Sequence, residues 1–151
     1  MTIQKLTLIA AVFASAAFAQ EKKIQHADLP PAVEKAVAAQ SQGATIREFS
    51  QEKENGQLLY EAEMTVNGHS KDISMDAIGA IIEVEEQVAL DSLPAAVRTG
   101  LQAKPGAGKI VKVESITKHD KVVAYEAQVR TGGKKAEVQV SPEGKPLDHE
   151  D

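Results

Sequence analysis

The fold is decided by the stretch QLLYEAEMTV, residues 57–66, which has Asn55-Gly56 in front of it and Asn67-Gly68 behind it. Apolar residues at every second position alternate with more polar ones, which predicts a strand with one buried face. An Asn-Gly pair favours a type I′ hairpin turn, because both of its central residues take positive φ. The stretch therefore predicts an antiparallel strand between two hairpins. The apolar set is Leu58, Tyr60, Ala62, Met64 and Val66.

Strands are predicted on both sides of this one, over residues 46–53 and 69–75, with a short further strand over 80–84. Ile46 and Phe49 fall out of phase with a simple alternation. One extra residue in a strand produces such a phase shift, so a β-bulge is expected there.

A second set of strands is predicted further along the chain, over residues 110–117, 123–129, 134–140 and 145–147. The strand over 123–129 alternates in the same way as the first, with Val123, Tyr125, Ala127 and Val129 on one side. Val113 and Ile116 are again out of phase in the strand before it. A second bulge is expected there for the same reason.

A short helix precedes each set. In the first, Asp28 is predicted to cap a helix that opens with Pro30 and Pro31, carries the stripe Val33, Ala36 and Val37, and ends at Gly43. In the second set, Ser92 is predicted to cap a helix that opens with Pro94 and ends at Pro105-Gly106. Its apolar stripe is Val97 and Leu101, with Ala96. Helices this short are marginal alone in water, so each must pack on a sheet.

The two sets match each other in order and spacing. Leu29-Pro30-Pro31-Ala32-Val33 corresponds to Leu93-Pro94-Ala95-Ala96-Val97, and Tyr60-Glu61-Ala62 corresponds to Tyr125-Glu126-Ala127. Self-similarity at a fixed period indicates repeated units. The predicted fold class is therefore α+β: two tandem α-β-β-β(-β) repeats that form antiparallel sheet with the helices on one face. The repeats are predicted over residues 28–87 and 88–151, after a loose polar lead-in over 20–27, and their sheets are expected to join or pack into one body.

The composition excludes several classes of protein. With 17 basic and 22 acidic residues the net charge is −5, which disfavours nucleic-acid binding because that needs a basic surface. The chain has no Cys, so it holds no disulfide, thiolate nucleophile or zinc–thiolate site. It also has no Trp and few other aromatic residues.

The first nineteen residues have the pattern of a secretory signal peptide. Lys5 is followed by an apolar run from Leu6 to Phe18, and Ala17-Phe18-Ala19 is a small-x-small cleavage site. A membrane anchor is the alternative, but a spanning helix needs roughly 20 apolar residues and this run is shorter. Cleavage after Ala19 and a periplasmic or secreted mature protein are predicted, with no membrane span.

The ordered set of motifs resembles the PepSY-like family, also described as β-lactamase-inhibitor-like. The resemblance implies a secreted or periplasmic, non-catalytic domain. Related PepSY domains occur in protease propeptides and are thought to restrain peptidases, and β-lactamase inhibitory proteins grip an enzyme with a long curved sheet. This chain differs from those inhibitors because it lacks their disulfides and an aromatic-rich face. The residues that carry the resemblance are Leu29, Pro30, Val33, Tyr60, Glu61, Gly68, Asp76, Gly79 and Ile82, then Leu93, Pro94, Val97, Tyr125, Glu126, Gly133, Gly144 and Leu147.

No catalytic residue, cofactor site or metal site is predicted. His26, His69, His119 and His149 fall in the lead-in, in predicted turns or at the C-terminus, without a scaffold that holds a general base. Acidic residues cluster at Glu83-Val84-Glu85-Glu86 and in the tail from Asp148 to Asp151. Oxygen ligands suit Ca²⁺ or Mg²⁺, but the spacing of an EF-hand is missing, so the clusters are interpreted as solvated surface.

Charge is shared unequally between the two predicted repeats. Residues 28–87 hold 12 acids and 4 bases, whereas residues 88–151 hold 9 acids and 10 bases. A field of this kind steers a charged partner, or helps the two halves associate with each other. The best candidate partner-binding surface is the strand face away from the helices, and the alternative is that this face is plain solvated sheet. Its predicted residues are Leu59, Glu61, Glu63, Thr65, Ala124, Glu126, Gln128 and Arg130.

Three functions remain open, in this order. The first is a non-catalytic module that binds a protein partner, such as a peptidase or another envelope enzyme that it restrains. The second is a cation-responsive envelope protein that uses its acidic surface for Ca²⁺ or a similar ion. The third is an enzyme of a type that the sequence does not reveal.

Overall fold

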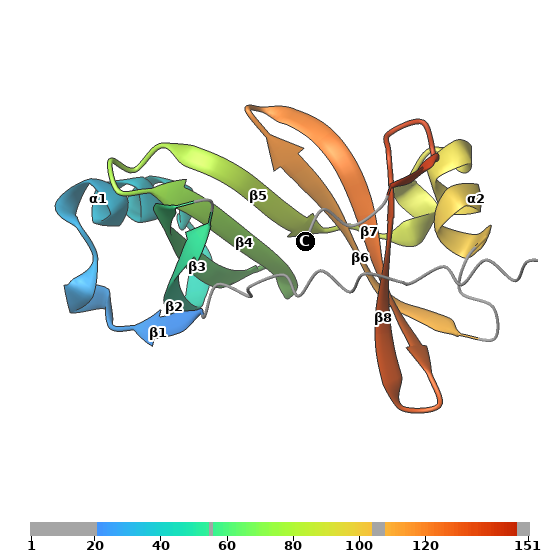
Figure 1. Cartoon of the computed structure of the whole chain (residues 1–151), viewed down its shortest axis with the longest axis horizontal. Helices are drawn as coiled ribbons and strands as arrows, with labels where there is room; N and C mark the ends of the chain where they lie inside the picture. The colour runs from blue at the N-terminus through green and yellow to red at the C-terminus, as the bar shows by residue number, and fades with distance from the viewer. Residues whose placement is uncertain (1–20, 55, 104–107, 148–151) are drawn as a thin grey trace, which may run out of the picture.

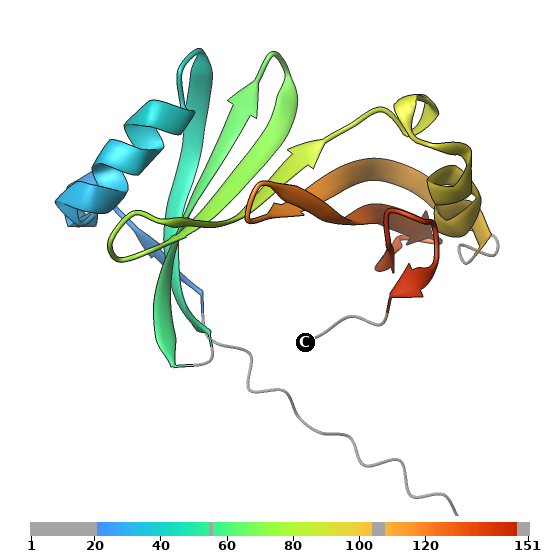
Figure 2. The same cartoon turned by 90° about the horizontal axis from the view of Figure 1, so that it is seen from above.

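The structure is a computed structural model that describes residues 21–54, 56–103 and 108–147. Nine strands form one antiparallel sheet in which the spatial order is the order along the chain, β1 to β9 (Figure 1). Two α-helices, α1 and α2, lie at opposite ends of the molecule in both views (Figure 2). Both pack on the same face of the sheet, and no helix of the described residues lies on the other face. The strands are β1 (Lys22–Ile24), β2 (Ala44–Glu54), β3 (Gln57–Val66), β4 (His69–Asp76), β5 (Ile81–Gln87), β6 (Lys109–Lys118), β7 (Lys121–Thr131), β8 (Lys134–Val140) and β9 (Pro146–Leu147), and the helices are α1 (Pro31–Gln40), α2 (Ala95–Ala103) and the 3₁₀ turns η1 (His26–Asp28) and η2 (Leu90–Ser92).

The predicted fold class, α+β built of two tandem repeats, is wrong. The chain is mainly β, and one uninterrupted sheet runs through it. The prediction failed at residues 85–91, which the sequence presents as a link between two units. Instead β5 continues to Gln87 and pairs with β6, from Glu83↔Lys118 to Gln87↔Glu114. The pairing turns this stretch into the centre of the sheet.

The helix-bearing face of β3 and β4 holds the first core. Val33 and Val37 of α1 are buried against Met64 and Ile73, which are fully enclosed. The alternation in 57–66 explains this, since every second side chain of β3 points at the helix. The members of this core are Leu29, Val33, Val37, Tyr60, Ala62, Met64, Ile73 and Met75.

The second core lies under α2 on β6, β7 and β8. Val97 and Leu101 of the helix are fully buried against Val113, Ala127 and Val140. The two cores share no buried residue, but they lie on one face of one sheet. Each short helix is therefore held by the apolar stripe that the sequence predicts.

A tight turn after β4 and another after β8 dock on the helices. Gly79 and Gly144 both have a φ of 78°, and a side chain on either would collide with a helix carbonyl, that of Ala32 or of Ala96. Glycine is needed twice over, for the positive φ and for the close approach. These turns fix each helix to its sheet.

The predicted strand boundaries agree closely with the structure, and the predicted hairpin at Asn67-Gly68 is confirmed by φ values of 51° and 85°. The bulge predicted in the first strand is confirmed, because the register of β2 against β3 shifts between Ile46 and Glu48. In β6 the register shifts twice, between Ile110 and Lys112 and between Ile116 and Thr117, on either side of the predicted place.

The helix caps differ from the prediction. Asp28 ends η1, where its carboxylate accepts a hydrogen bond from the Gln25 N–H at 2.9 Å, and Pro30 is the residue before α1. Ser92 likewise donates to the Ala89 carbonyl in η2. Within the stretch 20–27, which the sequence marks as a polar lead-in, Lys22–Ile24 pairs with β2. That strand is too short to be recognised without its partner.

Several predictions lie outside the described residues: the signal peptide over 1–19, Asn55, the helix stop at Pro105-Gly106, and the acidic tail that includes His149. In the part of the chain that the structure describes, no helix has the length and apolar character needed to cross a bilayer.

Candidate functional site

The helix-free face of the sheet carries four carboxylates in one line across four strands. Glu48 of β2 is opposite Glu63 of β3, Glu63 is opposite Asp72 of β4, and Asp72 is opposite Glu85 of β5. Directly opposed residues on neighbouring strands point to the same side, about 5 Å apart. Like charges in that position destabilise a sheet. We call these four residues the carboxylate row.

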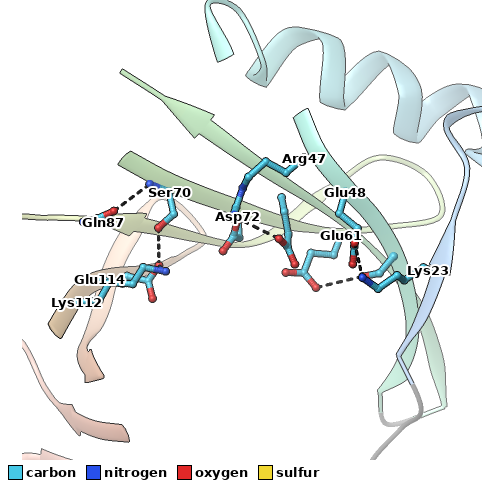
Figure 3. A network of polar contacts seen from close by, with 11 residues as sticks. Lys23, Arg47, Glu48, Glu61, Ser70, Asp72, Gln87, Lys112 and Glu114 are labelled. Carbon is cyan, nitrogen blue, oxygen red and sulfur yellow. Dashed lines mark hydrogen bonds and ion pairs between the residues drawn. The ribbon is translucent and has the colours of Figure 1, made fainter. Parts of the chain in front are cut away.

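Two cations from the chain lie along the row (Figure 3). The Lys23 ammonium is paired with Glu48. The Arg47 guanidinium bridges the next two positions, with Nη2 at 3.4 Å from Glu63 Oε2 and at 3.3 Å from Asp72 Oδ1. Arg47 sits at the bulge of β2, which breaks the alternation and lets this side chain join the helix-free face.

At the centre of the sheet the row meets a buried carboxylate of β6. Glu114 is 3% exposed. It forms an ion pair with Lys112 and accepts a hydrogen bond from Ser70 Oγ at 3.1 Å, while the Ser70 N–H donates to Gln87 Oε1 at 3.1 Å (Figure 3). These bonds tie β4, β5 and β6 together at the junction of the two halves.

Burial raises the pKa of several of these carboxyl groups. For Glu85 the pKa is raised to about 8, first by burial and then by the neighbouring Glu83, which also shares a hydrogen bond with it. For Glu61, beside the row on β3, burial and then nearby acidic groups raise the pKa to about 7. Burial also raises the pKa of Asp72, although Arg47 opposes that shift. Desolvation and like charge both favour the protonated acid, so this face retains protons near neutral pH.

The same face of the second half is balanced in charge. At the junction of the two halves, Lys118 Nζ of β6 lies 2.9 Å from Glu83 Oε2 of β5. Further along, Glu126 accepts a hydrogen bond from Gln139 Nε2 at 2.8 Å, and Arg130 is exposed beside them. The excess of negative charge is thus confined to the part of the face between β2 and β5.

The residues predicted for the binding surface all lie on strands β3 and β7, on the helix-free side. Glu61, Glu63, Thr65, Glu126 and Gln128 are half-buried and Arg130 is exposed. Leu59 and Ala124, predicted to be exposed, are buried at 5% each. They lie on interior strands between longer side chains of the same face: Leu59 is flanked by Glu52 and Asp76, and Ala124 is opposite Ile116.

The sequence did not single out Glu48, Asp72 or Glu114, and it marked Glu85 as part of a solvated cluster. Glu85 is half-buried on a central strand, because β6 pairs beyond it. The signal that could have found the row is the alternation in β4 and β5 combined with a strand register. Only the register shows that these acids are opposite one another.

Two groups of carboxylates in the described residues are close enough to share a cation. They are Glu21, Glu48 and Glu63, and Asp72, Glu85 and Glu114, and within each group the ligand oxygens lie within 4.8 Å of one another. Carboxylate oxygens are the ligands that Ca²⁺ and Mg²⁺ prefer. In the first group Lys23 and Arg47 already neutralise Glu48 and Glu63.

The three histidines that the structure describes form no contact with the carboxylate row. His26 stacks at a tilt on Phe49, with ring centroids 5.6 Å apart, and its Nε2 is 3.6 Å from Glu34. His69 is exposed at the start of β4, and His119 is exposed in the hairpin turn between β6 and β7. Near His26 a groove of about 630 Å³ separates α1 from β1 and β2. Lys23 pairs there with Glu48, and Arg47 is engaged outside the groove with Glu63 and Asp72.

Comparison with known proteins gives the fold. Neither a known family nor a curated protein matches the sequence. Among solved structures the chain is similar to a protein from Bacteroides eggerthii that is predicted to be periplasmic, with a TM-score of 0.64, 19% identity, and coverage of 80% of this chain and 86% of that one.

Two further structures share this fold. A DUF2874 family protein from Bacteroides ovatus has a TM-score of 0.60 and 18% identity, covering 80% of this chain and 85% of that one. A BLIP-like protein from Bacteroides fragilis has a TM-score of 0.55 and 21% identity, covering 78% of this chain and 82% of that one. The likeness to a BLIP-like structure supports the β-lactamase-inhibitor-like part of the predicted resemblance, and the PepSY-like part stays a prediction.

Proposed function

We propose that the chain is a periplasmic or secreted, non-catalytic module that binds a protein partner on the helix-free face of its sheet. The single observation that carries this is the carboxylate row, Glu48, Glu63, Asp72 and Glu85, on a face that no helix covers. Opposed like charges work against folding, so their presence is better explained by a partner than by stability. The PepSY resemblance suggests the class of partner, an envelope enzyme such as a peptidase that the module restrains.

The proposed location rests on the signal-peptide pattern and on the similar structures. Residues 1–19 have the required order of charge, apolar run and cleavage site. The similar protein from Bacteroides eggerthii is itself predicted to be periplasmic. Mass measurement of the protein purified from the periplasm should give a chain that begins at Gln20. A chain that retains Met1 would contradict this part of the proposal.

The binding function is tested by capture from an envelope fraction of the source organism. The mature protein is the bait, beside the charge-reversed variant Glu61→Lys/Glu63→Lys. The matched control, Glu34→Lys/Asp91→Lys, makes the same change in net charge on α1 and η2, where both residues are exposed. We expect one specific partner, lost from the first variant and kept by the control.

Charge reversal beside Arg47 could disturb folding, so the neutral variant Glu61→Gln/Glu63→Gln is used beside it and thermal unfolding is measured for each bait. The captured partner is then assayed with and without the module, to learn whether the module inhibits it. The proposal is contradicted if the folded parent protein captures nothing. It is also contradicted if the Glu61/Glu63 variants retain the partner as well as the control does.

A second candidate function, a cation-responsive envelope protein, is favoured by the group Asp72, Glu85 and Glu114, whose oxygens converge within 4.8 Å. Ca²⁺ would replace the protons held there and would raise the thermal stability by mass action. Calorimetric titration with Ca²⁺ and Mg²⁺ tests this. No heat and no shift in the unfolding temperature at millimolar ion would end this candidate.

A further inference from the structure

We propose that the face between β2 and β5 docks a lysine- or arginine-bearing segment of the partner protein, with one cationic group placed between Asp72 and Glu85. The inference rests on the proposed function and names the chemistry of the partner. It also implies that docking displaces protons from the empty face, so that binding depends on pH.

The excess of acidic side chains on this face is complementary to a cationic partner. Strand register places nine acids on the helix-free side of β2 to β5, whereas Lys23 and Arg47 are the two cations of the described residues that form ion pairs with the carboxylate row there. Lys118 and Lys112 approach from β6, but they pair with Glu83 and Glu114. A neutral or acidic partner surface would leave this charge unbalanced on desolvation, and a cationic one would balance it. The nine acids are Glu48, Glu52, Glu54, Glu61, Glu63, Asp72, Asp76, Glu83 and Glu85.

The chain itself shows how a cation fits the row. Arg47 bridges Glu63 and Asp72 at 3.4 and 3.3 Å. The next interval, between Asp72 and Glu85, has the same cross-strand pairing. Within the described residues Glu85 has no basic partner, and its hydrogen bond is to another acid, Glu83. The interval repeats the cross-strand pairing that Arg47 bridges, but here Lys112 acts only on the Asp72 side and no cation of the described residues pairs with Glu85.

Two residues of β6, Glu114 and Ile116, border the interval between Asp72 and Glu85. Glu114 closes one end, with an oxygen within 4.8 Å of Asp72 and Glu85, and Ile116 is directly opposite Glu85 on β6. Ile116 is buried, so the long stem of an incoming lysine or arginine stays above the sheet while its head reaches the carboxylates. A planar guanidinium also matches two carboxylates at once.

Proton release follows from the groups that face Glu85. Glu83 lies on its own strand, Asp72 on β4, and Glu114, Lys112 and Lys118 on β6. Glu126 on β7 adds a further negative charge. With acids in the majority, an empty site keeps a proton on Glu85, and an arriving cation favours the ionised form. Affinity should therefore increase as the pH rises from about 6 to about 9, approaching tenfold per pH unit for one proton released.

Calorimetry with hexa-arginine tests the proposal on the mature protein, at constant ionic strength, near pH 6 and near pH 9. We expect at least tenfold tighter binding at the higher pH and proton release that depends on the buffer. Glu85→Gln should weaken binding at least fivefold near pH 9 and remove most of the pH dependence. Glu34→Gln makes the same charge change on α1 and should alter binding less than twofold. Equal effects of the two substitutions would overturn the proposal, since a general negative field would then explain binding.

A gain of function gives an independent test. Arg47→Met empties a second interval of the row, so hexa-arginine should bind at least threefold more tightly. Lys35→Met removes the same charge from the exposed side of α1 and is the control. If Arg47 has a purely structural role, its loss will leave binding unchanged or weaken it. Thermal unfolding confirms that both variants are folded.

Competition separates this inference from the proposed function. If a partner captured on this face is released by hexa-arginine and not by hexa-glutamate, both stand. A partner that depends on Glu61 and Glu63 but resists hexa-arginine leaves the function standing and overturns the cationic docking. Hexa-arginine binding without any captured partner supports the inference about chemistry and contradicts the protein-binding function. Ca²⁺ binding at Asp72 and Glu85 without peptide binding overturns the inference in favour of a metal site.

Discussion

The two halves of the sheet, β2–β5 with α1 and β6–β9 with α2, have the same order of elements and differ on one face. On the helix-bearing side they agree even in detail, since Gly79 and Gly144 dock their turns on the helix carbonyls of Ala32 and Ala96. On the helix-free side the first half has the carboxylate row and the second has a balanced set of charges. The two halves therefore pack their helices in the same way and differ in charge on the helix-free side.

The largest expected effects come from the two cores. Leu101→Ala in the second half and Met64→Ala in the first should each lower the free energy of unfolding by about 2–5 kcal/mol. Because β5 and β6 join the halves in one sheet, both substitutions should shift a single transition. Tyr60 and Tyr125 report on the two halves by fluorescence, isolated in Tyr125→Phe and Tyr60→Phe backgrounds. Different midpoints for the two tyrosines would show that the halves unfold separately.

The docked turns should be the next most sensitive. Gly144→Ala should cost roughly 3 kcal/mol, because the new Cβ meets the Ala96 carbonyl and φ is positive. Gly56 has a similar φ of 82° with open space around it, so Gly56→Ala should cost only about 1 kcal/mol. Urea unfolding measures both. Equal costs would mean that the turn does not need its close approach to α2.

The carboxylate row should make stability depend on pH. The folded chain keeps a proton on Glu85 up to about pH 8, whereas the unfolded chain releases it near 4.5. The stabilisation is therefore fully present below pH 4.5 and is lost as the pH rises through 8. Glu85→Gln should raise the free energy of unfolding by roughly 1–3 kcal/mol near pH 9, discounted for solvent screening, and change it little near pH 5. A variant that is no more stable than the parent near pH 9 would contradict the raised pKa.

The smallest effect is expected on the second half of the helix-free face. Arg130 is exposed there, and surface substitutions of this kind stay within about 0.5 kcal/mol. Arg130→Ala should therefore change the free energy of unfolding by no more than that amount. It should leave the affinity for hexa-arginine within twofold of the parent value. Strong loss or gain of peptide binding would show that both halves contribute to the surface.

Much of the fold could be read from local pattern. The alternation in Gln57–Val66, the Asn67-Gly68 turn and the bulge near Ile46 are local signals, and the structure confirms each of them. Whether the two predicted sheets join or only pack together could not be read in this way, because whether β5 ends at Val84 or continues to Gln87 depends on the partner strand β6. Tertiary pairing decided that boundary.

The candidate site was predicted only in part. Alternation placed Glu61 and Glu63 on the correct face, but it also predicted Leu59 and Ala124 to be exposed, which the flanking strands bury. The carboxylate row joins residues from four strands, and its members become neighbours only through the register. A sequence without a register cannot show which acids are opposite one another or that Arg47 reaches them through a bulge.

Site-specific cross-linking in an envelope fraction tests the binding surface most directly. A photoreactive amino acid is placed at Thr65 on the first half of the helix-free face, at Gln128 on the second half of that face, and at Ala38 on α1. We expect one partner to be cross-linked from Thr65, a much lower yield of that cross-link from Gln128, and none from Ala38. Cross-links that are strongest from Ala38, or equal from all three positions, would contradict the proposed binding surface.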